Sequence, residues 1–287
     1  MSHTGPADLK EAVREATARL AEAGIASAET DAVLLAAHAL GCSAGDVRKA
    51  MVLGAPAPPA YDALVSERAA RVPLQHLTGR AGFRHLVLHV GPGVFVPRPE
   101  TELVAGLAID AAREAGEVPV VVDLCTGSGA IALAVKDEVP AAQVYAVELG
   151  EDAHAWAAQN QSATGLAITL VHGDATTAFA ELDGQVDVVV SNPPYIPVGM
   201  VPIDPEVRDH DPDLALYGGS EDGLAIPLAV AARAAALLRS GGVLVMEHAD
   251  TQGESLPAAL ERTGAWRDIE DHEDLSARPR ATVAVRA

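Results

Sequence analysis

The sequence predicts an α/β protein in which a small helical bundle precedes a mainly parallel sheet with helices on both faces. Three observations lead to this prediction. Ala and Leu recur at helical spacing in the N-terminal part of the chain. Short, almost continuously apolar runs then alternate with segments of helix length. Glycine-rich or proline-rich turns follow two of these runs, at the edge where strands of a parallel sheet end.

The composition favours a protein with a large core and no polyanionic partner. The chain has 287 residues and is 49% hydrophobic, which is enough for one large domain and a small one. Its formal net charge of −20 repels polyanions, so we expect no direct binding to DNA. Cys42 and Cys125 lie far apart, which is not a disulfide framework. No Cys/His cluster has metal-ligand spacing, so no metal is expected.

The N-terminus carries no sign of export or membrane insertion. It has neither a basic segment nor an apolar segment of the kind found in signal peptides. No apolar run in the chain reaches the roughly 18 residues that a membrane-spanning helix needs. We therefore expect a soluble cytoplasmic protein without a membrane partner.

The N-terminal part is predicted to be helical. Gly24 and Gly41 are plausible helix ends, and a further helix is expected over residues 60–71, ahead of Pro73. The apolar stripe of the first helix consists of Leu9, Val13, Ala16 and Leu20. No residue pattern in this bundle indicates chemistry.

A connector with strand character follows the bundle. Residues 86–90 and 94–96 are short apolar runs split by Gly and Pro, a pattern typical of a hairpin. Glu100 and Thr101 then precede a helix that we expect to continue to about Arg113.

The remaining chain alternates strands with helices. Helices are expected over residues 130–138, 151–163 and 223–239. Five near-continuous apolar strands are expected over residues 118–124, 143–149, 167–174, 186–194 and 241–248. Residues 266–274 and 281–287 are expected to complete a sheet of seven strands, and these two late strands could be antiparallel.

The first motif is a glycine-rich turn, D-L-C-T-G-S-G, between the first long strand and a helix. Gly127 and Gly129 lack side chains that would keep a ligand from the backbone, and the next helix offers free N–H groups. Asp123 suits a ligand that carries an ammonium group, whereas pyrophosphate sites use G-x-G-x-x-G. The alternative is a purely structural turn. The candidate cofactor-binding residues of this turn are Asp123, Cys125, Thr126, Gly127, Ser128 and Gly129.

Acidic residues end the next two strands. Glu148 follows the glycine turn by about twenty residues, the position from which nucleotide-binding units bind ribose hydroxyls. Asp174 could accept a hydrogen bond from an adenine amino group, and an ordinary turn or helix-capping role is nearly as good an explanation. Both are candidate cofactor-binding residues.

The second motif, Asn192-Pro193-Pro194-Tyr195, follows an apolar strand. The prolines stiffen it, so the Asn192 side-chain oxygen and the Pro193 carbonyl can both accept from one NH₂ group. Two such acceptors would turn the lone pair of an amide or amine nitrogen toward a methyl donor. Tyr195 offers a flat face to a planar target. We take Asn192, Pro193 and Tyr195 as catalytic candidates, all four residues as substrate-binding candidates, and Asn192 as also a candidate cofactor-binding residue.

With both motifs in view, the chain resembles the HemK/PrmC family, the N5-glutamine methyltransferases of peptide chain release factors. The resemblance extends from about residue 73 to the end of the chain. It rests on PLQHLTG, VFVPRPETELV, DLCTGSGAIALAV, SNPPYIP, LYGGSEDGL, GGVLVME and DLSARPRATVA. The pairing of PRPET with NPPY is highly specific, whereas NPPY alone also occurs in DNA, RNA and other protein methyltransferases.

The resemblance implies a class I, Rossmann-like methyltransferase domain over residues 98–287, a β-hairpin linker over 79–97 and a helical substrate-binding domain over 1–78. It implies S-adenosylmethionine as methyl donor, which leaves as S-adenosylhomocysteine. The implied substrate is the glutamine of a Gly-Gly-Gln tripeptide in a release factor, held by residues 192–195.

Further roles follow from the same resemblance. Residues 126–129 would line the donor, and Glu148 would hold its ribose. Arg98, Pro99 and Glu100 would lie where linker and active site meet, with Arg98 and Glu100 in contact with substrate. Arg98 is expected to organise the pocket.

Two positions depart from the family pattern. Cys125 stands where the family commonly has Gly, and it can still serve through its backbone. After Glu247 the family often shows E-x-G-x-x-Q, whereas here the residue two positions on is Ala249. The second departure puts the local turn in question.

Three other functions are compatible with parts of this pattern. An adenine-N6 DNA methyltransferase would need a basic surface, which the net charge of −20 disfavours. A non-catalytic binding module would not need Asn192 and Tyr195 intact. A methyltransferase for a glutamine of a ribosomal protein would differ only in the N-terminal domain.

Overall fold

The computed structural model describes residues 8–287, which form two compact units. The smaller unit contains the described chain up to Arg80 and the segment Pro202–His210. The larger unit contains Ala81–Val201 and Asp211–Ala287. The chain therefore leaves the larger unit at Val201 and returns to it at Asp211.

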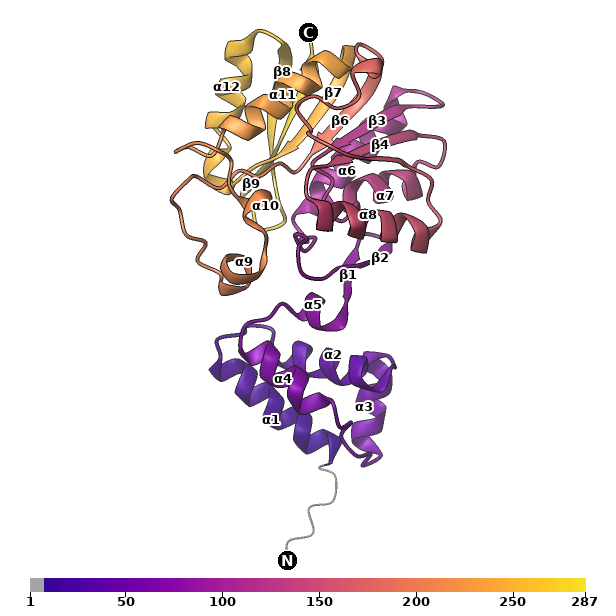
Figure 1. Ribbon diagram of the computed structural model, residues 1–287, viewed down its shortest axis with the longest axis vertical. Helices are drawn as coiled ribbons and strands as arrows, with labels where there is room; N and C mark the ends of the chain where they lie inside the picture. Colours follow the sequence, from indigo (N-terminus) through magenta and orange to yellow (C-terminus); the bar gives the residue numbers. More distant parts are fainter. Residues whose placement is uncertain (1–7) are drawn as a thin grey trace, which may run out of the picture. The chain divides into compact units, whose positions relative to one another are not determined.

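The smaller unit is helical, as expected (Figure 1). Its helices are α1 (Leu9–Glu22), α2 (Ala28–Leu40), α3 (Ala44–Val52), α4 (Tyr61–Ala69), α5 (Leu74–Thr78) and α9 (Pro205–His210). The predicted stripe of α1 is buried in its core. Helices α3 and α5 were not predicted, although Ser43 and Asp46 form a capping box at the start of α3.

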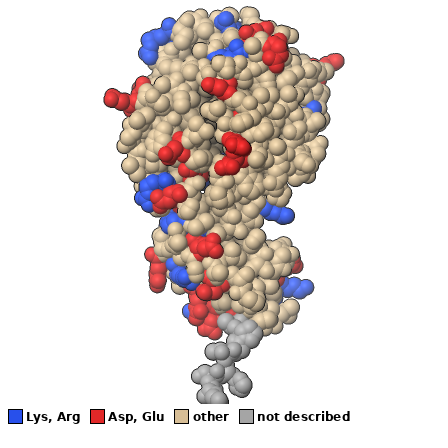
Figure 2. All heavy atoms as spheres, in the orientation of Figure 1, with Lys and Arg blue, Asp and Glu red and all other residues tan. Residues whose placement is uncertain are grey.

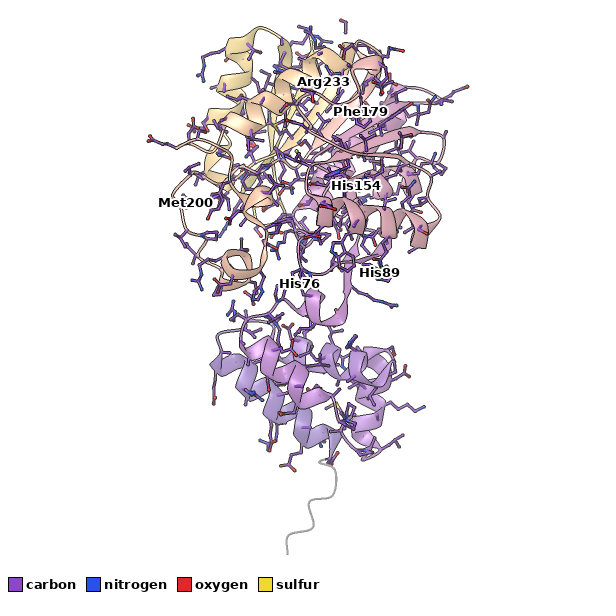
Figure 3. The ribbon with its side chains drawn as sticks, in the orientation of Figure 1. His76, His89, His154, Phe179, Met200 and Arg233 are labelled. Carbon is purple, nitrogen blue, oxygen red and sulfur yellow. The ribbon has the colours of Figure 1, made fainter. Side chains whose placement is uncertain are left out.

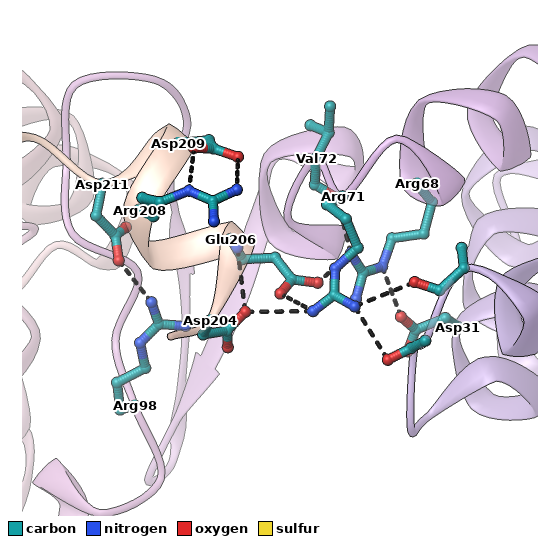
Figure 4. Close-up of polar contacts among 12 residues, drawn as sticks. Asp31, Arg68, Arg71, Val72, Arg98, Asp204, Glu206, Arg208, Asp209 and Asp211 are labelled. Atoms are coloured by element: carbon teal, nitrogen blue, oxygen red, sulfur yellow. Dashed lines mark hydrogen bonds and ion pairs between the residues drawn. The ribbon is translucent and has the colours of Figure 1, made fainter. Parts of the chain in front are cut away.

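Buried ion pairs join α9 to the N-terminal helices within this unit (Figure 4). The Arg68 guanidinium donates from Nε to Asp31 Oδ2 over 2.7 Å and from Nη1 to Glu206 Oε1 over 2.6 Å. Arg71 Nη2 donates to the other Glu206 oxygen over 2.5 Å. Because Asp31, Arg68 and Glu206 are all buried, loss of one partner would leave an uncompensated charge.

The hairpin exists, but one of its predicted strands was wrong. The two-stranded sheet pairs β1 (Arg80–Phe83) with β2 (Leu86–His89), whereas residues 94–96 lie outside any strand, with Val94 and Val96 buried. The chain reverses at Arg84, whose φ is 50°, directly before the apolar run. Gly and Pro residues at 91–93 then interrupt extended pairing beyond β2.

The larger unit is built on a seven-stranded sheet with the order β5-β4-β3-β6-β7-β9-β8. Its strands are β3 (Val120–Leu124), β4 (Gln143–Glu148), β5 (Thr169–His172), β6 (Val186–Ser191), β7 (Leu238–Glu247), β8 (Trp266–Glu273) and β9 (Pro279–Arg286). The first five are parallel, and β9 pairs antiparallel with both β7 and β8. The predicted mainly parallel sheet with late antiparallel strands is confirmed.

Helices cover both faces of this sheet (Figure 1). On one face lie α6 (Thr101–Ala115), α7 (Ala130–Glu138) and α8 (Glu151–Thr164), and on the other lie α11 (Ala225–Leu237) and α12 (Ser255–Thr263). The short helix α10 (Asp213–Leu216) precedes α11. Among the described residues, no helix has the length and apolar character that a membrane crossing requires.

The strand order reverses beside β3. From β3 the chain proceeds outward through β4 and β5, and it then returns to place β6 on the opposite side of β3. Ligands of open α/β sheets bind at such a switch point, outside the carboxyl ends of the strands. The residues that follow β3, β4 and β6 therefore form the place to look for a site.

Candidate active site

The two sequence motifs emerge next to each other. Strands β3 and β6 are hydrogen-bonded neighbours in which Leu124 pairs with Ser191, the last residue of each strand. The Ser191 hydroxyl donates to the Leu124 carbonyl over 2.5 Å and ties the two strand ends together. The glycine turn and the NPPY segment therefore start from adjacent points on the same edge of the sheet.

The glycine turn owes its shape to left-handed backbone. Cys125, Gly127 and Gly129 have φ values of 68°, 57° and 83°. A Cβ at Gly127 would meet no other atom, so the backbone there is open to a ligand. Cys125 adopts a conformation that favours glycine, which accounts for the Gly expected at this position from the resemblance. Holding a non-glycine residue such as Cys125 in this left-handed conformation costs about 1 kcal/mol of folding free energy.

Asp123 lies fully buried below this turn. Its Oδ2 accepts from the Thr126 hydroxyl over 2.6 Å and from the Ala132 amide over 3.1 Å. Its Oδ1 has no hydrogen-bond partner among the described residues. Burial raises the pKa of Asp123 to about 7, against the effect of both hydrogen bonds. A buried, unpaired carboxylate oxygen suits a cationic ligand group.

Glu148 joins the turn to the end of β4. Its Oε2 accepts from the Gly127 amide over 2.8 Å, and its Oε1 accepts from the Gly150 amide over 2.7 Å. Each oxygen keeps capacity for a further hydrogen bond. The Ser128 carbonyl accepts a hydrogen bond from Nδ2 of Asn160 on α8 over 2.9 Å, which fixes this part of the turn against that helix.

Asp174 is exposed and forms a turn after β5. Its Oδ1 accepts from both the amide and the hydroxyl of Thr176, and these hydrogen bonds lower its pKa. Asp174 thus stabilises a turn, which is one of the two roles considered for it from the sequence. An adenine-binding role for Asp174 stays a prediction, as does a ribose-binding role for Glu148.

The NPPY segment is held on its buried side by two separate contacts. Asn192 Nδ2 donates to the Thr101 hydroxyl over 3.4 Å, at the first residue of α6. The Tyr195 hydroxyl donates to Glu247 Oε1 over 3.3 Å, at the last residue of β7. Pro193, between them, is buried, and its carbonyl accepts no hydrogen bond from the described residues.

The backbone of Tyr195 is braced by a loop from further along the chain. Gln252 Nε2 donates to the Tyr195 carbonyl over 3.1 Å and to the Asp222 carbonyl over 2.9 Å. A Cβ on Gly223 would lie 2.1 Å from the same Tyr195 carbonyl oxygen. The segment 218–223 therefore packs against the NPPY backbone so closely that glycine is required.

The turn after Glu247 forms without the family's glycine. Ala249 has φ −64° and ψ 149°, which any residue can adopt. Its amide donates to Gln252 Oε1 over 3.0 Å, which orients the Gln252 amide toward Tyr195. The departure at Ala249 thus leaves this local turn intact.

Arg98 and Glu100 differ in their surroundings. The Arg98 guanidinium donates to Asp211 Oδ2 over 2.7 Å and lies 4.9 Å from the centre of the Phe95 ring. Glu100 is exposed at the start of α6 and makes no capping hydrogen bond. A pocket-organising role for Arg98 and substrate contact by either residue stay predictions.

Sequence reasoning missed three residues of this site: Thr101, Glu247 and Gln252. Thr101 and Glu247 are buried and reach NPPY from α6 and β7. Burial raises the pKa of Glu247 to about 7, and the Arg280 guanidinium and the hydrogen bond from Tyr195 oppose this shift. The sequence did contain a signal for Glu247, because this carboxylate ends β7, the parallel strand next to β6.

An exposed apolar stretch follows the NPPY segment. Val198, Met200 and Val201 are 56%, 55% and 65% exposed. Figure 3 labels Met200 on the loop that they form. Exposed apolar residues grouped beside a site are typical of surfaces that contact another protein.

Two family profiles match the chain. One is described as PrmC N-terminal domain and matches residues 11–79. The other is described as methyltransferase small domain and matches residues 101–200. The chain also resembles the solved 16S rRNA N2 G1207 methyltransferase RsmC of T. thermophilus, with 24% identity and a TM-score of 0.49, over 72% of this chain and 50% of that one.

Curated relatives match almost the whole chain. The release factor glutamine methyltransferase of Streptomyces coelicolor is 54% identical over 96% of this chain and 97% of the relative. That of Bifidobacterium longum is 45% identical over 96% of this chain and 99% of the relative. A 4-amino-L-phenylalanine/4-methylamino-L-phenylalanine methyltransferase of Streptomyces pristinaespiralis is 44% identical over 90% of this chain and 89% of the relative.

Proposed function

We propose that this chain, which belongs to the family of release factor glutamine methyltransferases, methylates the side-chain amide nitrogen of a glutamine in a peptide chain release factor. The target is the glutamine of a Gly-Gly-Gln tripeptide, and the donor is S-adenosylmethionine. The observation that carries the proposal is the pairing of Leu124 with Ser191, which brings the glycine turn and NPPY to one edge of the sheet.

The residues around the glycine turn suit this donor. The unpaired Oδ1 of Asp123 would accept from its ammonium group, and the open backbone at Gly127 would admit its amino acid portion. Glu148 would bind the ribose hydroxyls and Asp174 the adenine amino group. Cys125, Thr126, Ser128 and Gly129 would line the same turn. When bound, S-adenosylmethionine supplies an electrophilic methyl group on a sulfonium.

The NPPY residues would activate the acceptor nitrogen. Asn192 Oδ1 and the Pro193 carbonyl would accept the two amide hydrogens, which favours a pyramidal nitrogen with its lone pair facing the methyl group. The stiff prolines keep both acceptors in place, and the Tyr195 ring would lie against the planar amide. A nitrogen–carbon bond forms while the carbon–sulfur bond breaks. The amide proton then leaves to water, so no strong base is required.

A protein substrate would explain an exposed apolar surface beside the active site and the presence of a helical N-terminal domain. The exposed apolar residues at 198–201 offer a contact surface beside NPPY. We assign recognition of the release factor to the helical domain over residues 1–78, joined by the linker over 79–97 to the methyltransferase domain over 98–287. A cytoplasmic location would place the enzyme with release factors.

DNA is a poor alternative acceptor. The net charge is −20, and on the face shown in Figure 2 basic side chains lie interspersed with acidic ones. That face lacks the continuous basic footprint that duplex binding uses.

The test is transfer of labelled methyl groups from S-adenosylmethionine to four acceptors. These are a purified release factor, the same factor with its Gly-Gly-Gln glutamine changed to alanine, duplex DNA, and 4-amino-L-phenylalanine. The proposal expects label on the intact factor alone. Equal labelling of both factors would move the target elsewhere on the protein. Label on DNA or the small amine alone would replace the proposed substrate.

A further inference from the structure

The buried side chain of Asn160 on α8 connects the glycine turn to the end of the hairpin. Its Nδ2 donates to the Ser128 carbonyl over 2.9 Å. The same nitrogen donates over 2.9 Å to the carbonyl of His89, the last residue of β2. Asn160 Oδ1 accepts from the His89 amide over 2.6 Å. One side-chain amide within the larger unit therefore holds both segments.

These partners fix the orientation of the Asn160 amide. Ser128 and His89 present two carbonyl oxygens and one N–H group to it. The NH₂ group supplies two donors and the amide oxygen supplies the acceptor, so every group is matched. A flipped amide would place its oxygen against a carbonyl and its NH₂ group against an N–H. The backbone of β2 thus decides that Nδ2 faces the glycine turn.

The glycine turn needs such a contact from outside. Ser128 stands between Gly127 and Gly129, whose backbones have positive φ. Because glycine populates both signs of φ, these neighbours do little to fix the peptide plane between Ser128 and Gly129. The hydrogen bond from Asn160 holds the carbonyl of that plane toward α8. The plane directly precedes Ala130, so its orientation affects the free N–H groups at the start of α7.

The segment after β2 lies along the same face of α8 as Asn160. Trp156 precedes Asn160 by one helical turn and shares this face. Its Nε1 donates to the Pro92 carbonyl over 3.2 Å. A Cβ on Gly91 would lie 2.5 Å from Trp156 Cζ2, so the close approach requires glycine. Residues 89–93 therefore brace Asn160 from the hairpin side.

We propose that Asn160 is a positioning residue for the methyl donor. By binding Ser128 and His89 together, it holds the glycine turn in the shape that receives S-adenosylmethionine. The proposal rests on the donor assigned in the proposed function. It goes beyond that function, because Asn160 belongs to neither sequence motif and acts on the donor only through Ser128.

The test compares Asn160→Leu with Gln161→Met. Each change replaces a side-chain amide on α8 by an apolar group of similar shape. Gln161 Nε2 donates to the Ile168 carbonyl over 2.8 Å, directly before β5 and so at the edge of the sheet away from the glycine turn. We expect Asn160→Leu to raise the dissociation constant of S-adenosylhomocysteine by roughly tenfold, and Gln161→Met to leave it within about twofold.

Steady-state kinetics separate positioning from a general loss of structure. A merely structural defect reduces the amount of active enzyme and so lowers kcat, whereas lost positioning raises the KM for S-adenosylmethionine. We expect Asn160→Leu to raise that KM, with kcat at saturating donor and the KM for the release factor close to those of the parent enzyme. An unchanged dissociation constant, or an equal change in Gln161→Met, would overturn the proposal.

A second pair of variants leaves Asn160 in place and perturbs the hairpin side. Gly91→Ala brings a Cβ against Trp156, whereas a Cβ on Gly82 in β1 would meet no neighbouring atom within 4 Å. Neither glycine has a positive φ, so neither variant strains the backbone. We expect Gly91→Ala to raise the same dissociation constant several-fold and Gly82→Ala to leave it unchanged. Equal donor affinities in these two variants would contradict the role of residues 89–93.

Failure of the proposed function has a different signature. If the parent enzyme binds S-adenosylhomocysteine but does not methylate the release factor, the acceptor assignment falls and the role of Asn160 stands. If the parent enzyme does not bind S-adenosylhomocysteine, the donor assignment and this proposal fall together.

Discussion

Asn192 is the residue on which the acceptor half of the site depends. Its side chain is held by Thr101, and nothing in its contacts ties it to the glycine turn. We expect Asn192→Ala to lower turnover by at least about a hundredfold, because one of two oriented acceptors is removed. Donor affinity should change little. Turnover and a direct donor titration measure the two effects, and normal turnover in the variant would remove Asn192 from catalysis.

Single residues were predictable where they belong to a contiguous motif. Asn192 and Tyr195 stand three positions apart in NPPY, and the glycine turn is equally compact. Thr101 lies 91 positions from Asn192, and Glu247 lies 52 positions from Tyr195. Those two contacts exist because β6 neighbours β7 and α6 packs on both strands. Such proximity follows from the fold and cannot be seen in local spacing.

Cys125 illustrates a departure that the backbone explains. Its φ of 68° falls in the region where a Cβ is disfavoured. Burial also raises the pKa of its thiol, so the thiol stays protonated and is a poor nucleophile. A contribution of Cys125 to donor binding through its backbone stays a prediction.

At the scale of elements, the loop over residues 218–223 supports the catalytic segment. A Cβ on Gly223 would lie 2.1 Å from the Tyr195 carbonyl oxygen and 3.0 Å from Gln252 Nε2. Gly223→Ala must displace this backbone, so we expect turnover to fall at least about tenfold. Donor affinity should be retained.

Gly219→Ala provides a matched control for that loop. Gly219 has φ +79°, close to the +73° of Gly223, so both variants carry similar backbone strain. A Cβ on Gly219 would meet only side chains, the nearest atom being Ile226 Cγ1 at 3.3 Å. We expect Gly219→Ala to lose stability but keep turnover per folded molecule. Equal turnover in the two variants would show that the contact with Tyr195 is unimportant.

Helices and strands with a long, regular hydrophobic pattern were predicted correctly, and short ones were not. The central strands β3 and β6 are mostly apolar, and the structure has a strand at each predicted position, although β6 ends at Ser191 and not at residue 194. The hairpin itself was predicted, but one of its two strands was wrong because short apolar runs do not specify which neighbour they pair with. Helices α9 and α10 are six and four residues long, too short for periodicity to reveal.

At the scale of the whole molecule, buried carboxyl groups shape the dependence of stability on pH. The pKa of Asp123 rises from 3.8 to about 7 on folding. Between these values the folded protein binds more protons than the unfolded chain, so this group's contribution to stability falls as pH rises. We expect the Tm of the parent enzyme, relative to Asp123→Asn, to decline between about pH 4 and pH 7. Parallel Tm profiles for the two proteins would refute this assignment.

The division of the chain was only partly visible in the sequence. The change of texture near residue 73 marks the end of the N-terminal helices. The return of Pro202–His210 to the helical unit has no such marker, because it depends on Glu206 meeting Arg68 and Arg71 more than 130 positions earlier. Charged residues in a short polar segment look like ordinary surface until their partners are known.

The most direct measurement is the position of the added methyl group on a release factor treated with the enzyme and S-adenosylmethionine. Tandem mass spectrometry of the peptide that contains Gly-Gly-Gln locates it. The account predicts one methyl group on the glutamine side-chain amide, formed at least about a hundredfold more slowly by the Asn192→Ala enzyme. A methyl group on another residue, or no methylation of the factor by the parent enzyme, would contradict it.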